Sequence, residues 1–214
     1  PAVATNNRMV LKPSEKTPLA AFVLADILYE AGLPPEMLSV VTGDPRVIAD
    51  EMLTHPDVDM VTFTGGVAIG KYIAGKAVYK RQVLELGGND PIIVMEDADV
   101  EEAATLAASG SYKNSGQRCT AVKRMLVHER VADQFVELLV AKTKALKYGD
   151  PMDPATDMGT VIDEPAAQHF EQVVSQAIEG GAKLLAGHVR RGALYAPTVL
   201  DQVDPEMTVV KHET

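Results

Sequence analysis

Short apolar segments alternate with longer segments whose apolar residues recur at helical spacing, and glycine or proline separates most of them. Strand-like segments lie at 38–41, 58–64, 82–86, 91–95 and 122–127, and helix-like segments lie at 17–31, 45–53, 67–78, 99–109 and 131–146. Such alternation is typical of α/β folds in which helices connect parallel strands. We therefore predict an α/β fold whose strands are parallel and mostly buried.

A pair of glycines, Gly87 and Gly88, divides this pattern. The chain has 214 residues, which is enough for one large domain or for parts of two. We predict two domains, at 1–86 and 87–214. The chain begins with Pro1 in place of Met, and the sequence ends at Thr214 with no terminal helix. We therefore expect a fragment of a longer protein.

Composition argues against several classes of function. The net charge of −10 disfavours binding to nucleic acid, which requires clustered Lys and Arg. No apolar segment approaches the roughly 20 residues that cross a membrane, and we find no basic start followed by the apolar segment of a signal peptide. A single cysteine excludes an internal disulfide and is typical of a cytoplasmic protein. The five His are scattered, so we expect no metal site.

The single cysteine, Cys119, lies in the polar segment Asn-Ser-Gly-Gln-Arg-Cys-Thr at 114–120. A lone cysteine is most often a small buried apolar residue. Here the neighbours are polar, and the positive charge of Arg118 favours the reactive thiolate. From these residues alone, a catalytic nucleophile and a structural residue are both possible interpretations.

A second candidate is Glu85, at the end of an apolar strand and directly before the glycine pair. We expect this carboxylate to be buried, which suits a general base. The alternative is a glutamate that caps neighbouring backbone N–H groups.

The segment from Gly65 to Lys71 is similar to a phosphate-binding loop, but Tyr72 stands where that loop needs Ser or Thr to hold magnesium. This argues against a nucleoside triphosphatase. A strand–glycine–helix junction still presents free N–H groups that suit a phosphate. The alternative at Gly65 and Gly66 is a tight turn that needs small residues.

Lys12 and Glu15 follow an apolar segment and are able to bind ribose hydroxyls. An acidic residue at a ribose favours NAD over NADP, because it repels a 2′-phosphate. The alternative is a solvated loop. The Gly-x-Gly-x-x-Gly pattern of ordinary dinucleotide-binding turns is absent.

Four phrases in this order resemble the aldehyde dehydrogenase superfamily: Lys-Pro-Ser-Glu at 12–15, Phe-Thr-Gly-Gly at 63–66, Glu-Leu-Gly-Gly at 85–88 and Gly-Gln-Arg-Cys at 116–119. The spacing between Glu85 and Cys119 and the phrases at 195–199 and 211–214 are also similar. The resemblance implies part of a Rossmann-like NAD-binding domain at 1–86 and part of an α/β catalytic domain at 87–214.

The same resemblance implies a role for each matching residue. Cys119 is the expected nucleophile and Glu85 the base that activates water. The cofactor is expected to contact Lys12 and Glu15 at the adenosine ribose, Gly65 and Gly66 at the pyrophosphate, Gly87, and Glu213 at the nicotinamide ribose. The implied reaction passes through a thiohemiacetal and a thioester on Cys119, and Glu85 argues against the CoA-acylating branch.

Within the superfamily, the phrases at 85–91 and 110–124 are most similar to phosphonoacetaldehyde dehydrogenases. We expect NAD-dependent oxidation of an anionic aldehyde, and our first candidate is the conversion of phosphonoacetaldehyde to phosphonoacetate. Arg118 is expected to bind the anion. Non-phosphorylating glyceraldehyde-3-phosphate dehydrogenase, which generally uses NADP, and lactaldehyde dehydrogenase are the alternatives.

The family pattern implies that the whole protein is a homodimer or homotetramer and that the fragment alone is inactive. Two hypotheses from other classes remain at this point. A thiol hydrolase would act without NAD, and a non-catalytic remnant would hold a thiol of ordinary reactivity.

Overall fold

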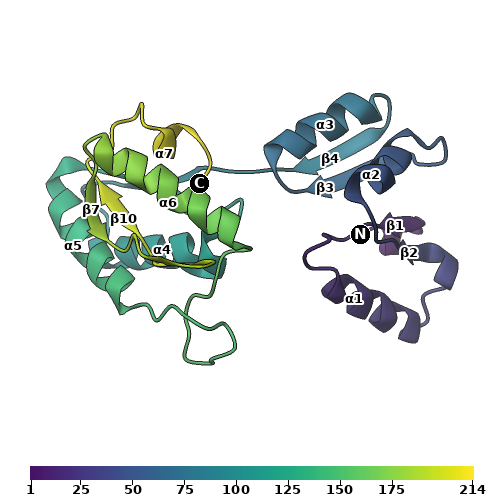
Figure 1. Ribbon diagram of the computed structural model, residues 1–214, viewed down its shortest axis with the longest axis horizontal. Coiled ribbons are helices and arrows are strands. Elements are labelled where there is room, and N and C mark those ends of the chain that lie inside the picture. The colour runs from purple at the N-terminus through teal and green to yellow at the C-terminus, as the bar shows by residue number, and fades with distance from the viewer. The chain divides into compact units, whose positions relative to one another are not determined.

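The computed structural model describes all 214 residues and shows two compact units, Pro1–Leu86 and Gly87–Thr214. Figure 1 shows the helices and strands of each unit. The boundary between the units falls between Leu86 and the glycine pair. Each unit is described separately below.

The first unit contains two parallel strand pairs. Strand β1 (Met9–Leu11) pairs with β2 (Leu38–Val40), and β3 (Met60–Thr64) pairs with β4 (Arg81–Glu85). The helices are α1 (Leu19–Glu30), α2 (Pro45–Thr54) and α3 (Val67–Ala77), and short 3-10 helices lie at Val3–Thr5 and Pro35–Met37. Helix α1 connects the first pair and α3 the second, so the predicted parallel α/β arrangement is confirmed in this unit.

Local sequence explains where these helices begin and end. Gly32 follows α1 with a φ of 92°, a conformation that a side chain disfavours. Asp44 caps α2 by accepting hydrogen bonds from the N–H groups of Arg46 and Val47. Helix α1 begins at Leu19, two residues after the predicted start at 17, and no side chain caps it.

A small core holds β3, β4 and the helices around them. Leu53, Ile73 and Ala77 are buried and pack against the inward residues of the strands. Every second residue of β3 is exposed, so the expectation of a fully buried strand is wrong there. The alternation shows that one face of this strand pair is covered and the other is open.

The second unit begins with a third parallel pair, β5 (Asp90–Val94) and β6 (Val122–Val127). Helices α4 (Val100–Tyr112) and α5 (Glu129–Ala145) pack against each other and against this pair, and a 3-10 helix spans Lys113–Gly116. The core is centred on Phe135, which is only 1% exposed, and on Val94 and Leu139.

The remainder of the second unit departs from the prediction. After α6 (Glu164–Glu179), strand β7 (Lys183–Ala186) pairs with β10 (Val199–Asp201), and β8 (Arg190–Arg191) pairs with β9 (Leu194–Tyr195), both antiparallel. The predicted parallel arrangement is therefore wrong in this segment. A tight turn at Gly192, whose φ is 60°, reverses the chain without a crossover helix. Helix α7 (Thr208–Lys211) follows.

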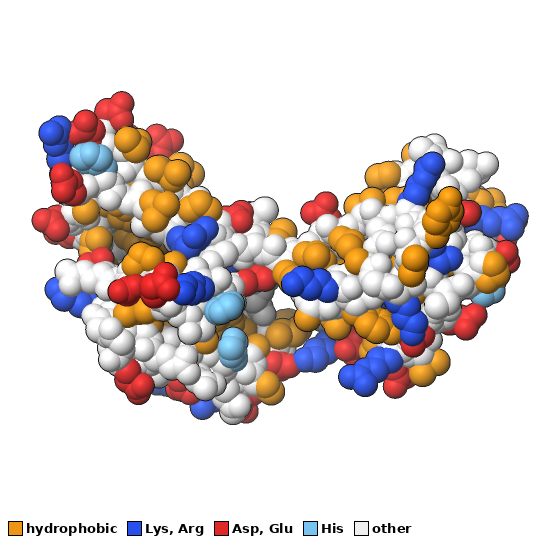
Figure 2. Space-filling view, turned by 90° about the horizontal axis from the view of Figure 1, so that it is seen from above, with side chains coloured by type: hydrophobic (Ala, Val, Ile, Leu, Met, Phe, Trp, Pro, Cys, Tyr) orange, Lys and Arg blue, Asp and Glu red, His pale blue; other side chains and the backbone are white.

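The surface charge and the length of the helices concern two kinds of partner, nucleic acid and membrane. Figure 2 shows basic and acidic side chains interspersed on the visible face of the molecule. No helix combines the length and apolar character needed to cross a membrane.

A side-chain cap at the beginning of α4 allows a test of how the helix start is stabilised. The Asp99 carboxylate accepts a hydrogen bond of 3.0 Å from the N–H of Glu102. We expect Asp99→Ala to lower the free energy of unfolding by about 1 kcal/mol, because one N–H of the helix start loses its partner. Urea denaturation measures this change, with Asp97→Ala as the matched control on an exposed neighbour. Equal changes in both variants would contradict the capping role.

Candidate active site

Cys119 lies in a turn between the 3-10 helix Lys113–Gly116 and β6, and its side chain is exposed. The alternative of a buried structural cysteine is therefore wrong. The backbone carbonyl of Cys119 packs so closely against Gly88 that a Cβ atom there would overlap it. Gly88 is thus required by close backbone packing, and it places the turn after Leu86 directly beside the thiol residue.

Three consecutive residues before the thiol, Asn114, Ser115 and Gly116, adopt left-handed backbone conformations with φ of 55°, 55° and 73°. Two of them are not glycine, which costs roughly 1 kcal/mol or more each unless the surroundings fix them. Here the Ser115 hydroxyl donates to the carbonyl of Gly159 at 3.0 Å. The Gln117 side chain accepts from the N–H of Ile162 at 2.7 Å. These contacts hold the turn that carries Cys119.

Arg118 is partly turned into the protein. Its Nη2 donates to the carbonyl of Gly110 in α4 at 2.9 Å, and its Nε is buried without a partner. Binding of a substrate anion by Arg118 remains a prediction. The anion would have to bind those N–H groups of the guanidinium that do not donate to Gly110.

Two basic residues, Lys123 and Arg124, lie at the start of β6. Both side chains are half-buried and hydrogen-bonded within the unit. Arg124 donates from Nε and Nη2 to the carbonyl of Asn89, at 3.0 and 2.7 Å. Lys123 donates to the carbonyl of Gly116 at 2.9 Å.

The structure brings the predicted cofactor residues Gly87 and Glu213 together. A Cβ atom at Gly87 would overlap the Glu213 carboxylate, so this carboxylate packs directly over the glycine. The Asn89 amide donates to the carbonyl of Val210 at 2.8 Å and ties the segment before Glu213 to the same turn. The sequence pattern gave no indication of the Asn89 contact. Three segments therefore meet here: the turn at 87–90, the thiol turn at 114–120 and the segment at 208–214.

Glu85 is the last residue of β4 in the first unit and is exposed. The expectation that it is buried is therefore wrong. Its carbonyl accepts from the N–H of Gly65 at 3.0 Å, which extends the β3–β4 pairing past Thr64. The side chain projects from the end of the strand that leads into the glycine turn, and its role as the base remains a prediction.

The two glycines after β3 differ in their surroundings. A Cβ atom at Gly65 would lie 2.5 Å from the Phe63 ring, whereas Gly66 faces open space. Gly66 precedes the first residue of α3, and no side chain caps this helix. Its first N–H groups therefore remain available to a phosphate.

Lys12 and Glu15 follow β1 in the same unit. The Lys12 ammonium donates to the carbonyl of Pro13 at 2.7 Å and lies 3.9 Å from the Glu15 carboxylate. The loop thus holds a cation and an anion side by side, an arrangement compatible with ribose hydroxyls.

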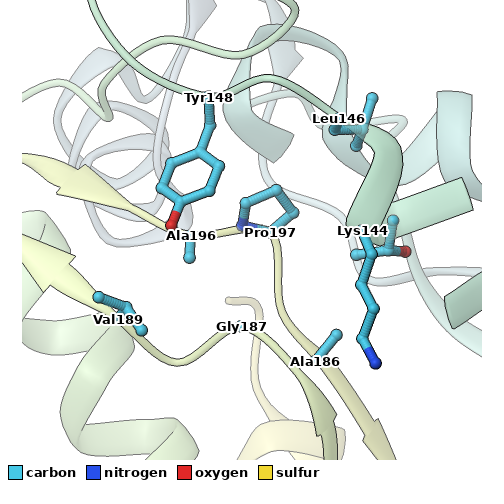
Figure 3. Close-up of a pocket in the computed structure, with 9 residues that line it drawn as sticks. Lys144, Leu146, Tyr148, Ala186, Gly187, Val189, Ala196 and Pro197 are labelled. Carbon is cyan, nitrogen blue, oxygen red and sulfur yellow. The ribbon is translucent and has the colours of Figure 1, made fainter. Parts of the chain in front are cut away.

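A cavity of about 230 Å³ elsewhere in the second unit is lined by residues such as Lys144, Tyr148 and Pro197 (Figure 3). None of the predicted site residues lines this cavity. It therefore provides no alternative location for the chemistry of Cys119.

Comparisons with known proteins bear directly on this arrangement. The aldehyde dehydrogenase family model matches residues 1–214. A 3-sulfolactaldehyde dehydrogenase of Priestia megaterium is 44% identical and covers 100% of this chain and 45% of that protein. A sulfoacetaldehyde dehydrogenase of Neptuniibacter caesariensis is 40% identical and covers 100% of this chain and 46% of that protein.

Solved structures give the same result. The NADP-dependent glyceraldehyde-3-phosphate dehydrogenase from Bacillus halodurans, complexed with NADP, superposes with a TM-score of 0.95 at 43% identity and covers 99% of this chain and 44% of that one. The chain thus spans about half the length of the relatives it matches, 45% in the first of them. The predicted aldehyde dehydrogenase fold is confirmed, and the chain belongs to the aldehyde dehydrogenase family.

Proposed function

We propose that the whole protein containing this chain oxidises a short anionic aldehyde to its carboxylate with NAD or NADP, using Cys119 as the nucleophile. The observation that carries the proposal is the exposed Cys119 on a fixed turn, beside the glycine turn on which Glu213 also packs. An exposed thiol at a fixed position suits attack on a small carbonyl compound.

Each unit holds residues that suit one part of a dinucleotide. The uncapped start of α3 after Gly66 offers N–H groups to the pyrophosphate. The Lys12 and Glu15 pair would bind the adenosine ribose, and Glu213 over Gly87 would bind the nicotinamide ribose. When bound, the dinucleotide accepts the hydride that the substrate loses on oxidation.

The chain's own residues supply the remaining chemistry. The Cys119 thiolate attacks the aldehyde carbon, and the backbone N–H of Cys119 donates to the oxygen that becomes negative. Oxidation leaves a thioester on the same sulfur. Glu85, exposed at the end of β4, takes a proton from water, and the resulting hydroxide releases the carboxylate and the free thiol.

Two kinds of anionic aldehyde are candidates. The phrases at 110–124 favour phosphonoacetaldehyde, our first candidate. The 44% identity to a 3-sulfolactaldehyde dehydrogenase favours a sulfonated aldehyde as the second. Phosphonate and sulfonate are both tetrahedral oxyanions, and both suit the partly free guanidinium of Arg118.

The proposal is tested by the rate of NADH or NADPH formation by the whole protein. The substrates are phosphonoacetaldehyde, 3-sulfolactaldehyde, glyceraldehyde 3-phosphate and lactaldehyde, each with NAD and with NADP. We expect kcat/KM for the first two to exceed that for neutral lactaldehyde by about 10-fold or more, since charge-assisted hydrogen bonds contribute that much. We expect NAD to be preferred, because Glu15 repels a 2′-phosphate.

Other outcomes separate the alternatives. A preference for lactaldehyde would contradict an anionic substrate but leave the dehydrogenase chemistry. Release of acid from a thioester in the absence of any dinucleotide, with no oxidation of aldehydes, would replace the proposal with a thiol hydrolase.

A further inference from the structure

Asn89 follows the two glycines of the turn at 87–90 and is half-buried. Its backbone carbonyl accepts two hydrogen bonds from the Arg124 guanidinium of β6, at 3.0 and 2.7 Å. Its side-chain amide donates to the backbone carbonyl of Val210 in α7, at 2.8 Å. A single residue therefore connects the glycine turn to β6 through its backbone and to α7 through its side chain.

The two polar atoms of the Asn89 side chain differ in what they contact. The amide nitrogen donates to Val210, whereas the amide oxygen is buried and has no hydrogen-bond partner in this chain. A buried oxygen without a donor lowers stability, and an apolar residue of similar size avoids that cost. Filling of space therefore does not explain an asparagine at this position, whereas the donor to Val210 does.

The hydrogen bond to Val210 lies close to a predicted cofactor residue. Helix α7 ends at Lys211, and the Glu213 carboxylate two residues later packs directly over Gly87. Gly87 and Asn89 belong to the same turn, so this turn contacts the segment at 208–213 twice. Gly87 has no side chain that could bind the carboxylate. The hydrogen bond from Asn89 is directional and therefore fixes where the segment lies.

We propose that Asn89 is a positioning residue for the dinucleotide, because it holds α7 against the glycine turn and so sets the place of the Glu213 carboxylate. This rests on the proposed function, in which Glu213 binds the nicotinamide ribose. A carboxylate that is already in place before the ribose arrives loses less conformational entropy on binding. Asn89 acts through Glu213 in this arrangement, so loss of its donor should weaken binding only while Glu213 is present.

The experiment measures the dissociation constant of NAD for the whole protein by isothermal titration calorimetry. Asn89→Leu keeps a similar size and removes the donor together with the buried oxygen. Asn89→Asp keeps the shape and replaces the donor with an acceptor. Asn7→Leu is the matched control, since it removes an exposed amide that bonds only within residues 2–7. Each Asn89 variant is also made in a Glu213→Ala background.

We expect the dissociation constant of NAD to rise by about 5- to 10-fold in Asn89→Leu, which is the typical contribution of one hydrogen bond, and at least as much in Asn89→Asp. In the Glu213→Ala background the same substitutions should change it by less than about 2-fold. The KM for NAD should rise with the dissociation constant while kcat changes by less than about 2-fold, because ribose binding is shared by the ground state and the transition state. Asn7→Leu should bind NAD as the unaltered protein does.

Hydrogen–deuterium exchange of the peptide that contains residues 205–213 reports how firmly α7 is held, without any measurement of activity. We expect faster exchange in Asn89→Leu and unaltered exchange in Asn7→Leu. Thermal unfolding shows whether each variant is folded. We expect Asn89→Leu to remain folded, because removal of the unpartnered oxygen offsets part of the lost hydrogen bond.

Several results would overturn the inference. They are an unaltered dissociation constant in a folded Asn89→Leu variant, an equal rise in the Glu213→Ala background, a fall in kcat with an unaltered KM for NAD, and loss of structure in both Asn89 variants. If the unaltered protein oxidises the aldehydes, these results leave the proposed function standing. A protein that binds NAD but oxidises none of the aldehydes would contradict the proposed function, and the binding measurements would still decide the role of Asn89. A protein that binds neither NAD nor NADP would overturn both.

Discussion

Replacement of Cys119 by alanine is expected to lower kcat for aldehyde oxidation by the whole protein by at least about 10⁴-fold, as removal of a covalent nucleophile does in other enzymes. No other cysteine of the chain can take over, because Cys119 is the single one. The measurement is steady-state NADH formation with phosphonoacetaldehyde or 3-sulfolactaldehyde.

The matched measurement is the stability of the alanine variant in urea. Because Cys119 is exposed, we expect the alanine variant to unfold at nearly the same urea concentration as the unaltered protein. A variant that retains more than about one tenth of kcat would contradict the assignment of the nucleophile. A variant that loses activity only because it unfolds would leave the assignment unsupported by this experiment, so Cys119→Ser is measured beside it as a second, nearly isosteric replacement.

Substitution of Gly88 by alanine is the second large effect that we expect. The added Cβ would overlap the backbone carbonyl of Cys119, and a backbone atom cannot rotate away as a flexible side chain can. The thiol residue has to move, and a displacement of about 1 Å at a reacting group costs roughly 100-fold in rate. We expect kcat to fall by at least that factor and the free energy of unfolding to fall by about 1–3 kcal/mol.

Gly75 in α3 is the matched control for this substitution. A Cβ atom at Gly75 has no neighbour within 4 Å. Gly75→Ala should therefore leave kcat unchanged and stabilise the helix by about 0.5–1 kcal/mol. Both substitutions are measured by NADH formation and urea denaturation. An active Gly88→Ala variant would show that the close packing on Cys119 is not required.

Local patterns in the sequence were sufficient to predict much of the secondary structure of the first unit. The helices at α2 and α3 and the strand β3 lie within one or two residues of the predicted ranges. These elements are defined by helical spacing, by the cap at Asp44 and by glycines at their ends, all of which are short-range features. The parallel pairing follows because a helix connects the strands.

The strands after residue 180 were less predictable, because they lack such short-range features. Strands β8 and β9 have two residues each, too few to show any periodicity. Their pairing depends on the turn at Gly192, and the pairing of β7 with β10 depends on packing in the unit. Antiparallel pairing of such short segments is decided by tertiary contacts.

By itself, the sequence determined the family, the parallel crossover units and the identity of the candidate nucleophile, because these are carried by short phrases and local periodicity. Only the tertiary structure decided that Cys119 is exposed, that Glu85 is not buried and that Glu213 packs on Gly87. Burial and such contacts depend on residues that are distant in sequence, as Gly87 and Glu213 are, and become neighbours only when the whole unit packs.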